Sequence, residues 1–249
     1  MVAGLNATEN QWPFFAFLAT PKKYCGATIV HKRFIVTTAS CIQGTQPDKI
    51  TVRVGSMKRP RAEKVKVRLV CITSGYQKLG PNAYDEDFAI MMLKEPLKFK
   101  SNIRPVRLTK ESDARTDWFK YAKCHVIGAG ASNKSLQVSK WVQYREVKFH
   151  DCVEGEPDKS VLCYRHLGEV GSLACRGDYG GPIVCERDGH RELVGLVSYG
   201  PEVCAPVGAA LGLMRAANFQ RFLNTTFFDC VNWLNSELAN KPQTYRFAP

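Results

Sequence analysis

Apolar and polar residues alternate in short runs along most of the chain, and Gly, Pro and Asn stand between the runs. Short runs rich in β-branched and aromatic residues predict β-strands. They cover residues 27–30, 33–38, 50–54, 65–70, 141–147, 182–184 and 192–198. Many short strands separated by turn signals favour an all-β sandwich or barrel.

One segment near the C-terminus has helical periodicity instead. Apolar residues recur there at three- and four-residue spacing, at Phe227, Val231, Leu234 and Leu238. Asn240 and Pro242 follow, and both are typical stop signals. The sequence therefore predicts a C-terminal α-helix. The stretch 108–123 is charged and poor in β-forming residues, so we expect it to connect two halves of the chain.

Composition and charge narrow the function classes. The chain has 249 residues, of which 45% are hydrophobic and 23% charged, and these values exclude a disordered chain, a collagen and a coiled coil. No apolar run is long enough to cross a membrane as a helix. The formal net charge of +12 favours anionic partners: sulfated glycans, lipid phosphates, an anionic membrane surface or nucleic acid. Solubility alone is the other explanation of this charge.

Ten cysteines are dispersed along the chain, without a CxxC pair or a Cys/His cluster at zinc spacing. An even, dispersed set is typical of disulfides formed in an oxidising compartment. N-glycosylation sequons at Asn6, Asn133 and Asn224 point the same way. We therefore expect a secreted, disulfide-bonded glycoprotein, and we expect no metal site and no cofactor.

The most specific local signal is the segment 177–185, which reads Gly-Asp-Tyr-Gly-Gly-Pro-Ile-Val-Cys. It resembles the nucleophile motif GDSGGP of the trypsin-like serine proteases, which is followed by a short strand and a cysteine. Four further segments resemble family motifs in the family's order: 25–29, 34–41, 87–93 and 124–130, the last with Ala129 where tryptophan is usual. The resemblance extends from the first residue to the predicted final helix.

This resemblance implies a single trypsin-like domain over 1–249. Its fold would be all-β, with two six-stranded antiparallel Greek-key β-barrels, roughly 1–110 and 111–225, followed by the C-terminal α-helix. The family's disulfides would join Cys25 to Cys41, Cys124 to Cys185, Cys152 to Cys163 and Cys175 to Cys204. Cys71 and Cys230 are then left as a fifth pair, one that the family does not commonly share.

Two of the three positions of the family's catalytic triad hold other residues. Ser40 stands in place of the histidine and Tyr179 in place of the nucleophilic serine, while Asp87 is retained. A serine hydroxyl cannot act as a general base near neutral pH, and a phenol has a reference pKa of about 10. None of the five histidines matches the catalytic position: His31, His125, His150, His166 and His190. We therefore expect an inactive homologue, similar to the pseudoproteases of granules and of arthropod and mite secretions. A sequencing or engineering artefact at the two positions is the alternative.

The resemblance also carries expectations for the substrate pocket and the amino terminus. The aligned pocket positions are Leu173, Tyr179, Ser198 and Gly200. We expect the ring of Tyr179 to fill the oxyanion region or the mouth of the primary specificity pocket, and we expect the groove to be partly closed. Asp178 aligns with the aspartate that pairs with the amino terminus in the family. The Met1 amine is one candidate partner for Asp178, and nearby backbone amides are the alternative.

Basic residues gather in one segment of the first half, at Lys58, Arg59, Arg61, Lys64, Lys66 and Arg68. Bases and valines alternate in 64–68, so on a strand all these bases share one face. A second run holds Lys94, Lys98, Lys100, Arg104, Arg107 and Lys110, and either cluster can include Lys22, Lys23, Lys32 and Arg33. Arginine and lysine both suit sulfate and phosphate, so we expect a polyanion site. A solvated basic surface is the alternative.

These observations together predict a secreted, catalytically inactive homologue that acts by binding. The expected partners are a sulfated glycan such as heparin, or an acidic protein of a proteolytic cascade such as complement or coagulation. An anionic membrane surface is a further candidate. No motif for specific nucleic-acid recognition is present, and we expect a monomer. A receptor ligand and a hydrolase with residual activity are the alternatives.

Overall fold

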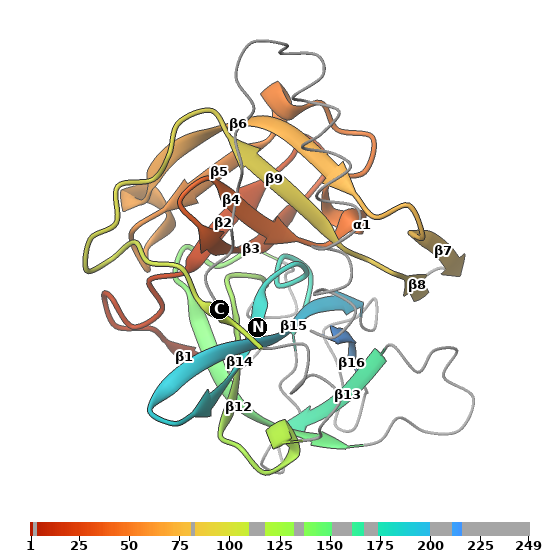
Figure 1. The fold of residues 1–249 in the computed structure, drawn as a ribbon. Coiled ribbons are helices and arrows are strands. Elements are labelled where there is room, and N and C mark those ends of the chain that lie inside the picture. The colour runs from red at the N-terminus through yellow and green to blue at the C-terminus, as the bar shows by residue number, and fades with distance from the viewer. Residues whose placement is uncertain are drawn as a thin grey trace.

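The computed structural model describes residues 1, 4–80, 83–109, 118–131, 137–150, 161–166, 174–199 and 211–215. Strands dominate these residues, and the helices among them are short. Figure 1 shows two β assemblies, the first coloured red to yellow and the second green to blue. The predicted C-terminal helix lies outside the described residues. No described helix is long and apolar enough to cross a membrane.

The first half of the chain folds into a closed six-stranded antiparallel barrel. Its strands follow the order β2 (Phe15–Ala19), β3 (Tyr24–His31), β4 (Phe34–Thr37), β9 (Ala89–Leu93), β6 (Glu63–Ile72) and β5 (Thr51–Val54). β4 and β9 are buried along their whole length. In β5 and the first half of β6, more exposed residues alternate with less exposed valines, because successive side chains of a strand point to opposite faces.

The second half forms a further ring of antiparallel strands. They pair in the order β12 (Gln143–His150), β11 (Cys124–Gly128), β14 (Pro182–Arg187), β15 (His190–Tyr199), β16 (Leu211–Arg215) and β13 (Val161–His166), and β13 pairs back with β12. Two short strands join from outside, β1 (Leu5–Asn6) on β12 and β10 (Arg107–Leu108) parallel to β15. The predicted β-barrel architecture of trypsin type is thus confirmed.

The remaining elements are short. They are α1 (Ala39–Ile42), the 3-10 helices η1 (Pro47–Lys49), η2 (Arg59–Arg61) and η3 (Trp118–Lys120), and the hairpin of β7 (Gln77–Gly80) and β8 (Ala83–Asp85). The expected connection 108–123 begins in β10, and its described part contains η3. α1 and η2 carry residues of the sites below.

The buried apolar side chains form two clusters, the larger of which draws on both halves, and the halves meet at a close backbone contact. Phe15 and Phe34 belong to the first cluster, and Ile183 belongs to the second. A Cβ atom on Gly26 of β3 would lie 2.6 Å from the Cα atom of Gly181. Only glycine permits this approach, which brings the turn before β14 against β3. The contact therefore places residues of both halves in one site.

Disulfides hold both halves. One bridge joins Cys25 of β3 to Cys41 of α1, and another joins Cys124 of β11 to Cys185 of β14. These are two of the four bridges that the resemblance implies. Cys71 and Cys175 are also disulfide-bonded, and no described cysteine is free. The predicted pairings that involve the side chains of Cys152, Cys163, Cys204 and Cys230 lie outside the described residues.

Candidate functional site

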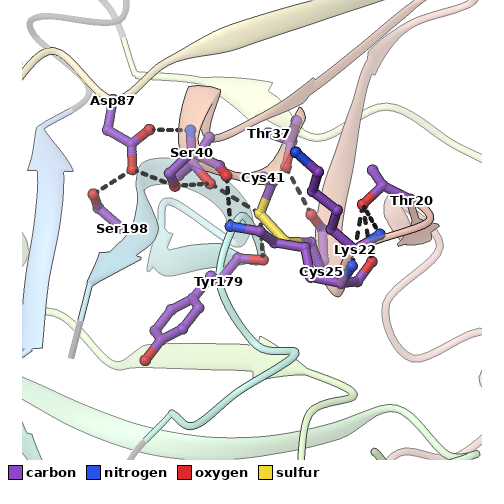
Figure 2. The surroundings of a disulfide bond; sticks show 12 residues. Thr20, Lys22, Cys25, Thr37, Ser40, Cys41, Asp87, Tyr179 and Ser198 are labelled. Atoms are coloured by element: carbon purple, nitrogen blue, oxygen red, sulfur yellow. Dashed lines mark hydrogen bonds between the residues drawn. A yellow bond between two sulfur atoms is a disulfide. The ribbon is translucent and has the colours of Figure 1, made fainter. Parts of the chain in front are cut away.

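The site lies where the two halves meet. Asp87 lies two residues before β9, and Ser40 lies in α1 of the same half. Ser198 lies in β15 of the second half, and Tyr179 lies in the turn before β14. Figure 2 shows Ser40 and Ser198 both directed at the carboxylate of Asp87, on either side of it. The fold therefore brings together the predicted positions Ser40, Asp87 and Ser198.

Asp87 is fully buried and accepts hydrogen bonds from both serines. The hydroxyl of Ser40 lies 2.8 Å from its Oδ2 atom, and the hydroxyl of Ser198 lies 2.7 Å from the same atom. The backbone amide of Ser40 donates to Oδ1 over 2.7 Å. Burial raises the pKa of Asp87, and the hydrogen bonds from Ser198 and Ser40 oppose this rise. The site therefore holds a buried carboxylate whose hydrogen-bond donors are hydroxyls and an amide.

Lys23 is a cation whose charge acts on this carboxylate. Its Nζ atom donates to the backbone oxygen of Ser40 over 2.7 Å. Burial lowers the pKa of Lys23, and the charge of Asp87 opposes this effect. The sequence placed Lys23 only among bases that can extend a surface cluster, whereas the structure places it beside Ser40. No local signal identifies this contact, because it joins residues that follow different strands.

Tyr179 is half-buried, and its backbone and its ring have separate contacts. Its carbonyl oxygen accepts a hydrogen bond from the amide of Gly26 over 2.8 Å. Its ring points away from Asp87 and Ser40 (Figure 2) and packs against the apolar clusters of both halves. Leu173 and Gly200 lie outside the described residues. The expected closure of the substrate groove therefore stays a prediction.

Asp178 is the second fully buried carboxylate, and it has a different environment. The amine of Met1 lies 2.6 Å from its Oδ2 atom, and both groups are inaccessible to solvent. The same carboxylate accepts from the amides of Gly130 and Cys175, over 2.7 and 2.8 Å. Both partners considered from the sequence are therefore present together. The Met1 amine also donates to the carbonyl oxygen of Ala131 over 2.6 Å.

Known proteins with similar sequences agree with this architecture. The family model described as Trypsin matches residues 1–223. The chain belongs to the trypsin family. It is also similar to coagulation factor IX of Oryctolagus cuniculus, with 30% identity over 218 residues, which cover 84% of this chain and 78% of that protein. Membership of this family together with the disulfides indicates an extracellular protein.

The predicted basic segment lies on η2, the residue before it, and β6, and we call its residues together with Arg53 of β5 the basic face. The basic face thus consists of Lys58, Arg59, Arg61, Lys64, Lys66, Arg68 and Arg53. Lys64, Lys66 and Arg68 of β6 are exposed, while Val67 between them is buried. Arg53 was missed from the sequence because it reaches the face through strand pairing, directly opposite Lys64. Like charges directly opposite each other on a sheet are destabilising unless an anion compensates them.

Aromatic rings hold two cations of the basic face. The Nζ atom of Lys58 lies 4.7 Å from the ring centre of Trp141, and the guanidinium of Arg59 lies 4.8 Å from that of Tyr24. Such contacts contribute about 0.5–1 kcal/mol at exposed sites. They restrict these two side chains, so less conformational entropy would be lost when an anion binds.

A pocket of about 330 Å³ adjoins the basic face. Its lining includes Phe17, Leu18, Tyr24, Arg53, Arg59 and Pro60. It extends to Ala129 and Gly177, close to the turn that carries Tyr179. Two arginines thus flank a largely apolar hollow near the turn that carries Tyr179.

The second basic run is divided by the fold. The amide of Lys94 donates to the carbonyl oxygen of Lys66, so this end of the run continues the basic face. Lys100 lies 3.6 Å from Glu63 in an exposed ion pair. Arg104 and Arg107 lie elsewhere, beside the β14–β15 turn, and Lys110 lies outside the described residues.

Of the three sequons, one falls on described residues. Asn6 is exposed in β1, and its Oδ1 atom accepts a hydrogen bond from Gln143 over 3.3 Å. Asn133 and Asn224 lie outside the described residues. Glycosylation at all three stays a prediction.

Proposed function

We propose that this member of the trypsin family is a catalytically inactive, secreted protein that acts by binding anionic partners through the basic face. The observation that carries the first part is the hydrogen bond from the Ser40 hydroxyl to Asp87. In the triad mechanism this carboxylate orients an imidazole that takes the proton of the nucleophile.

The chemistry around Asp87 supports inactivity. The Ser40 hydroxyl donates a hydrogen bond to the carboxylate. Unlike an imidazole, a hydroxyl does not accept a proton near neutral pH. At the nucleophile position Tyr179 presents a phenol, whose ring points away from Asp87. Loss of base and nucleophile together leaves only the small residual effects of transition-state binding.

The basic face supports the binding role. Its cations come from the paired strands β5 and β6 and from the 3-10 helix η2 with the residue before it, and one of its arginines stands opposite a lysine. Sulfate groups of a glycan would relieve this repulsion, and arginine forks and lysine ammonium groups both bind sulfate. The attraction would weaken as salt rises, because the Debye length falls to about 8 Å at physiological ionic strength.

The pocket beside Tyr24 and Arg59 favours a second candidate partner, an acidic protein of a proteolytic cascade. A glycan has no apolar group for a hollow lined by Phe17, Leu18 and Pro60. A protein segment with an apolar side chain next to carboxylates would match both the hollow and the two arginines.

Retention on immobilised heparin over a salt gradient tests the binding role. Lys64→Glu/Lys66→Glu reverses two exposed cations of the basic face, and Lys148→Glu/Arg176→Glu makes the same charge change on the second half. We expect the unmodified protein and the control to elute well above about 0.15 M salt, and the basic-face variant to lose most retention. Equal elution of both variants would contradict binding through the basic face.

A further inference from the structure

The hollow of about 330 Å³ beside the basic face carries charge of a single sign in its lining. Arg53 and Arg59 line it, and none of its described lining residues is acidic. Phe17, Tyr24 and Pro60 give it apolar surface. Its volume falls within the range of small-molecule sites, about 300–1,000 Å³. A ligand that matches this lining combines an apolar body with a negative charge.

The floor of the hollow is the outer face of β2 and β5. Phe17 pairs with Arg53 across these two strands, and Ala19 pairs with Thr51. Because alternate residues of a strand share a face, these four side chains point the same way. Val52, between Thr51 and Arg53, is fully buried and faces the barrel core instead. The strand register therefore places an aromatic ring directly beside a guanidinium.

η2 forms one wall of the hollow, and the second half of the molecule holds it in place. The amide of Arg59 donates to the carbonyl oxygen of Lys140 over 2.8 Å, and the amide of Val142 donates to that of Met57 over 2.7 Å. Pro60, in the middle of η2, has a fixed φ angle. The wall is thus formed before a ligand arrives, which lowers the entropic cost of binding.

Both guanidinium groups of the hollow are held in position and are partly exposed. That of Arg59 lies 4.8 Å from the ring centre of Tyr24, and Nη1 of Arg53 donates to the carbonyl oxygen of Ala62 over 2.9 Å. A guanidinium has five N–H donors, so this bond leaves others for a ligand. Tyr24 is 49% exposed, so the hollow opens to solvent beside it. Two positioned arginines suit sulfate, phosphate and carboxylate groups.

Aromatic walls and free space determine the body of the ligand. The rings of Phe15 and Phe17 pack edge to face with their centres 5.2 Å apart, which fixes the ring of Phe17. Contacts between aromatic rings add to the gain from burying apolar area, so Phe17 and Tyr24 favour a ring over an aliphatic chain. Ala129 lines the hollow at the position where the family motif has tryptophan, and its small side chain leaves space there. A cavity of about 150 Å³ holds benzene, so this larger hollow has room for a bicyclic ring with its anionic group.

We propose that this hollow binds a small aromatic anion, a ring system that carries one sulfate, phosphate or carboxylate group. The ring packs against Phe17 and Tyr24, and the anionic group pairs with Arg53 and Arg59. Such binding goes beyond the proposed function, because it needs neither a glycan nor a partner protein and does not depend on whether the chain is an enzyme.

Isothermal titration calorimetry with naphthyl sulfate tests this site. Naphthol lacks the anionic group and inorganic sulfate lacks the ring, so these two compounds are the matched probes. We expect one saturable site for naphthyl sulfate, and affinities at least about tenfold lower for naphthol and for inorganic sulfate. Equal affinity for naphthol would contradict pairing with the arginines, and equal affinity for inorganic sulfate would contradict a role of the hollow.

Two double variants separate the hollow from the rest of the basic face. Arg53→Gln/Arg59→Gln removes both cations of the hollow and is expected to weaken binding of naphthyl sulfate at least about tenfold. Lys64→Gln/Lys66→Gln makes the same charge change on exposed residues that do not line the hollow, and it should change this affinity less than about threefold. An equal loss in both variants would overturn the proposal, because it would show a general attraction to the basic face. Heparin retention depends on Lys64 and Lys66 instead, so its failure would leave this site untouched.

Tyr24→Leu tests the aromatic wall without removing a charge. Because Tyr24 is half-exposed, this variant should keep the melting temperature of the unmodified protein. We expect its affinity for naphthyl sulfate to fall by about two- to tenfold, the contribution of one aromatic contact. Unchanged affinity would contradict a ring bound against Tyr24.

Discussion

The two fully buried carboxylates, Asp87 and Asp178, have opposite environments in the same molecule. Asp178 lies 2.6 Å from the Met1 amine, a full positive charge. Asp87 accepts hydrogen bonds from two hydroxyls and an amide, and Lys23, whose charge acts on it, bonds to the backbone of Ser40 instead. The region around Asp178 thus compensates its charge, whereas burial disfavours the charge of Asp87 and raises its pKa.

This difference separates the structural and chemical parts of a trypsin-like architecture. The Met1–Asp178 pair ties the amino terminus to the turn that carries Tyr179, and it needs only the terminal amine and a carboxylate. Catalysis by the triad needs a base beside Asp87 as well. The environment of each carboxylate, rather than its presence, distinguishes these two parts.

The largest expected effect comes from removing the charge of Asp178. Asp178→Asn leaves the Met1 amine buried without a counter-charge, which typically costs about 3–5 kcal/mol. For a chain of this size the melting temperature should fall by roughly 6–20 °C, measured by circular dichroism. Asp188→Asn is the control, because this carboxylate is 90% exposed and lies 3.8 Å from Arg187, and it should cost less than about 1 kcal/mol. An equal fall in melting temperature in the two variants would contradict a larger contribution of the buried ion pair than of the surface ion pair.

An intermediate loss of stability is expected when a hydroxyl that donates to Asp87 is removed. Ser198→Ala removes a donor at 2.7 Å from a fully buried carboxylate and should cost about 1–3 kcal/mol of unfolding free energy in urea. Ser40→Ala removes the other hydroxyl but keeps the amide of residue 40 as a donor, so its cost should be smaller. An unchanged stability in both variants would show that these bonds do not compensate the charge.

The smallest effect has the opposite sign. The pKa of Asp87 is raised in the folded state, so the protonated carboxyl contributes fully to stability at pH values below the ordinary carboxyl pKa. This contribution to stability is lost as pH rises through the pKa of the folded state. The side chain of Asp87→Asn does not ionise, so this variant avoids the loss. Its melting temperature at about pH 8 should be a few degrees higher than that of the unmodified protein, since 1 kcal/mol corresponds to about 2–4 °C. The advantage should disappear towards about pH 4. A lower melting temperature of this variant at about pH 8 would contradict a penalised charge at Asp87.

Local patterns in the sequence predicted much of this fold. Alternation of lysine and valine placed Lys64, Lys66 and Arg68 on one exposed face, and β6 has this arrangement. The motif cysteines gave the pairs Cys25–Cys41 and Cys124–Cys185 through the family resemblance. These features depend on short-range periodicity or on a specific motif.

The remaining features depend on contacts between distant segments. Arg53 joins the basic face through strand pairing, and Lys23 reaches Ser40 across 17 residues of sequence. Trp12, which precedes β2, packs against His125 of β11, and no local pattern predicts this contact between distant segments. A single sequence does not encode such neighbours in any local pattern.

Intact-mass analysis after incubation with a serine-directed fluorophosphonate tests the central claim most directly. The reagent forms a covalent bond only with an activated nucleophilic hydroxyl. An active trypsin-like protease in the same solution is the positive control, and Ser40→His/Tyr179→Ser, which supplies a complete triad with Asp87, is the matched variant. The account predicts that the unmodified protein gains no mass while the control enzyme is labelled and the double variant gains labelling. A stoichiometric adduct on the unmodified protein would show an activated nucleophile and would contradict the account.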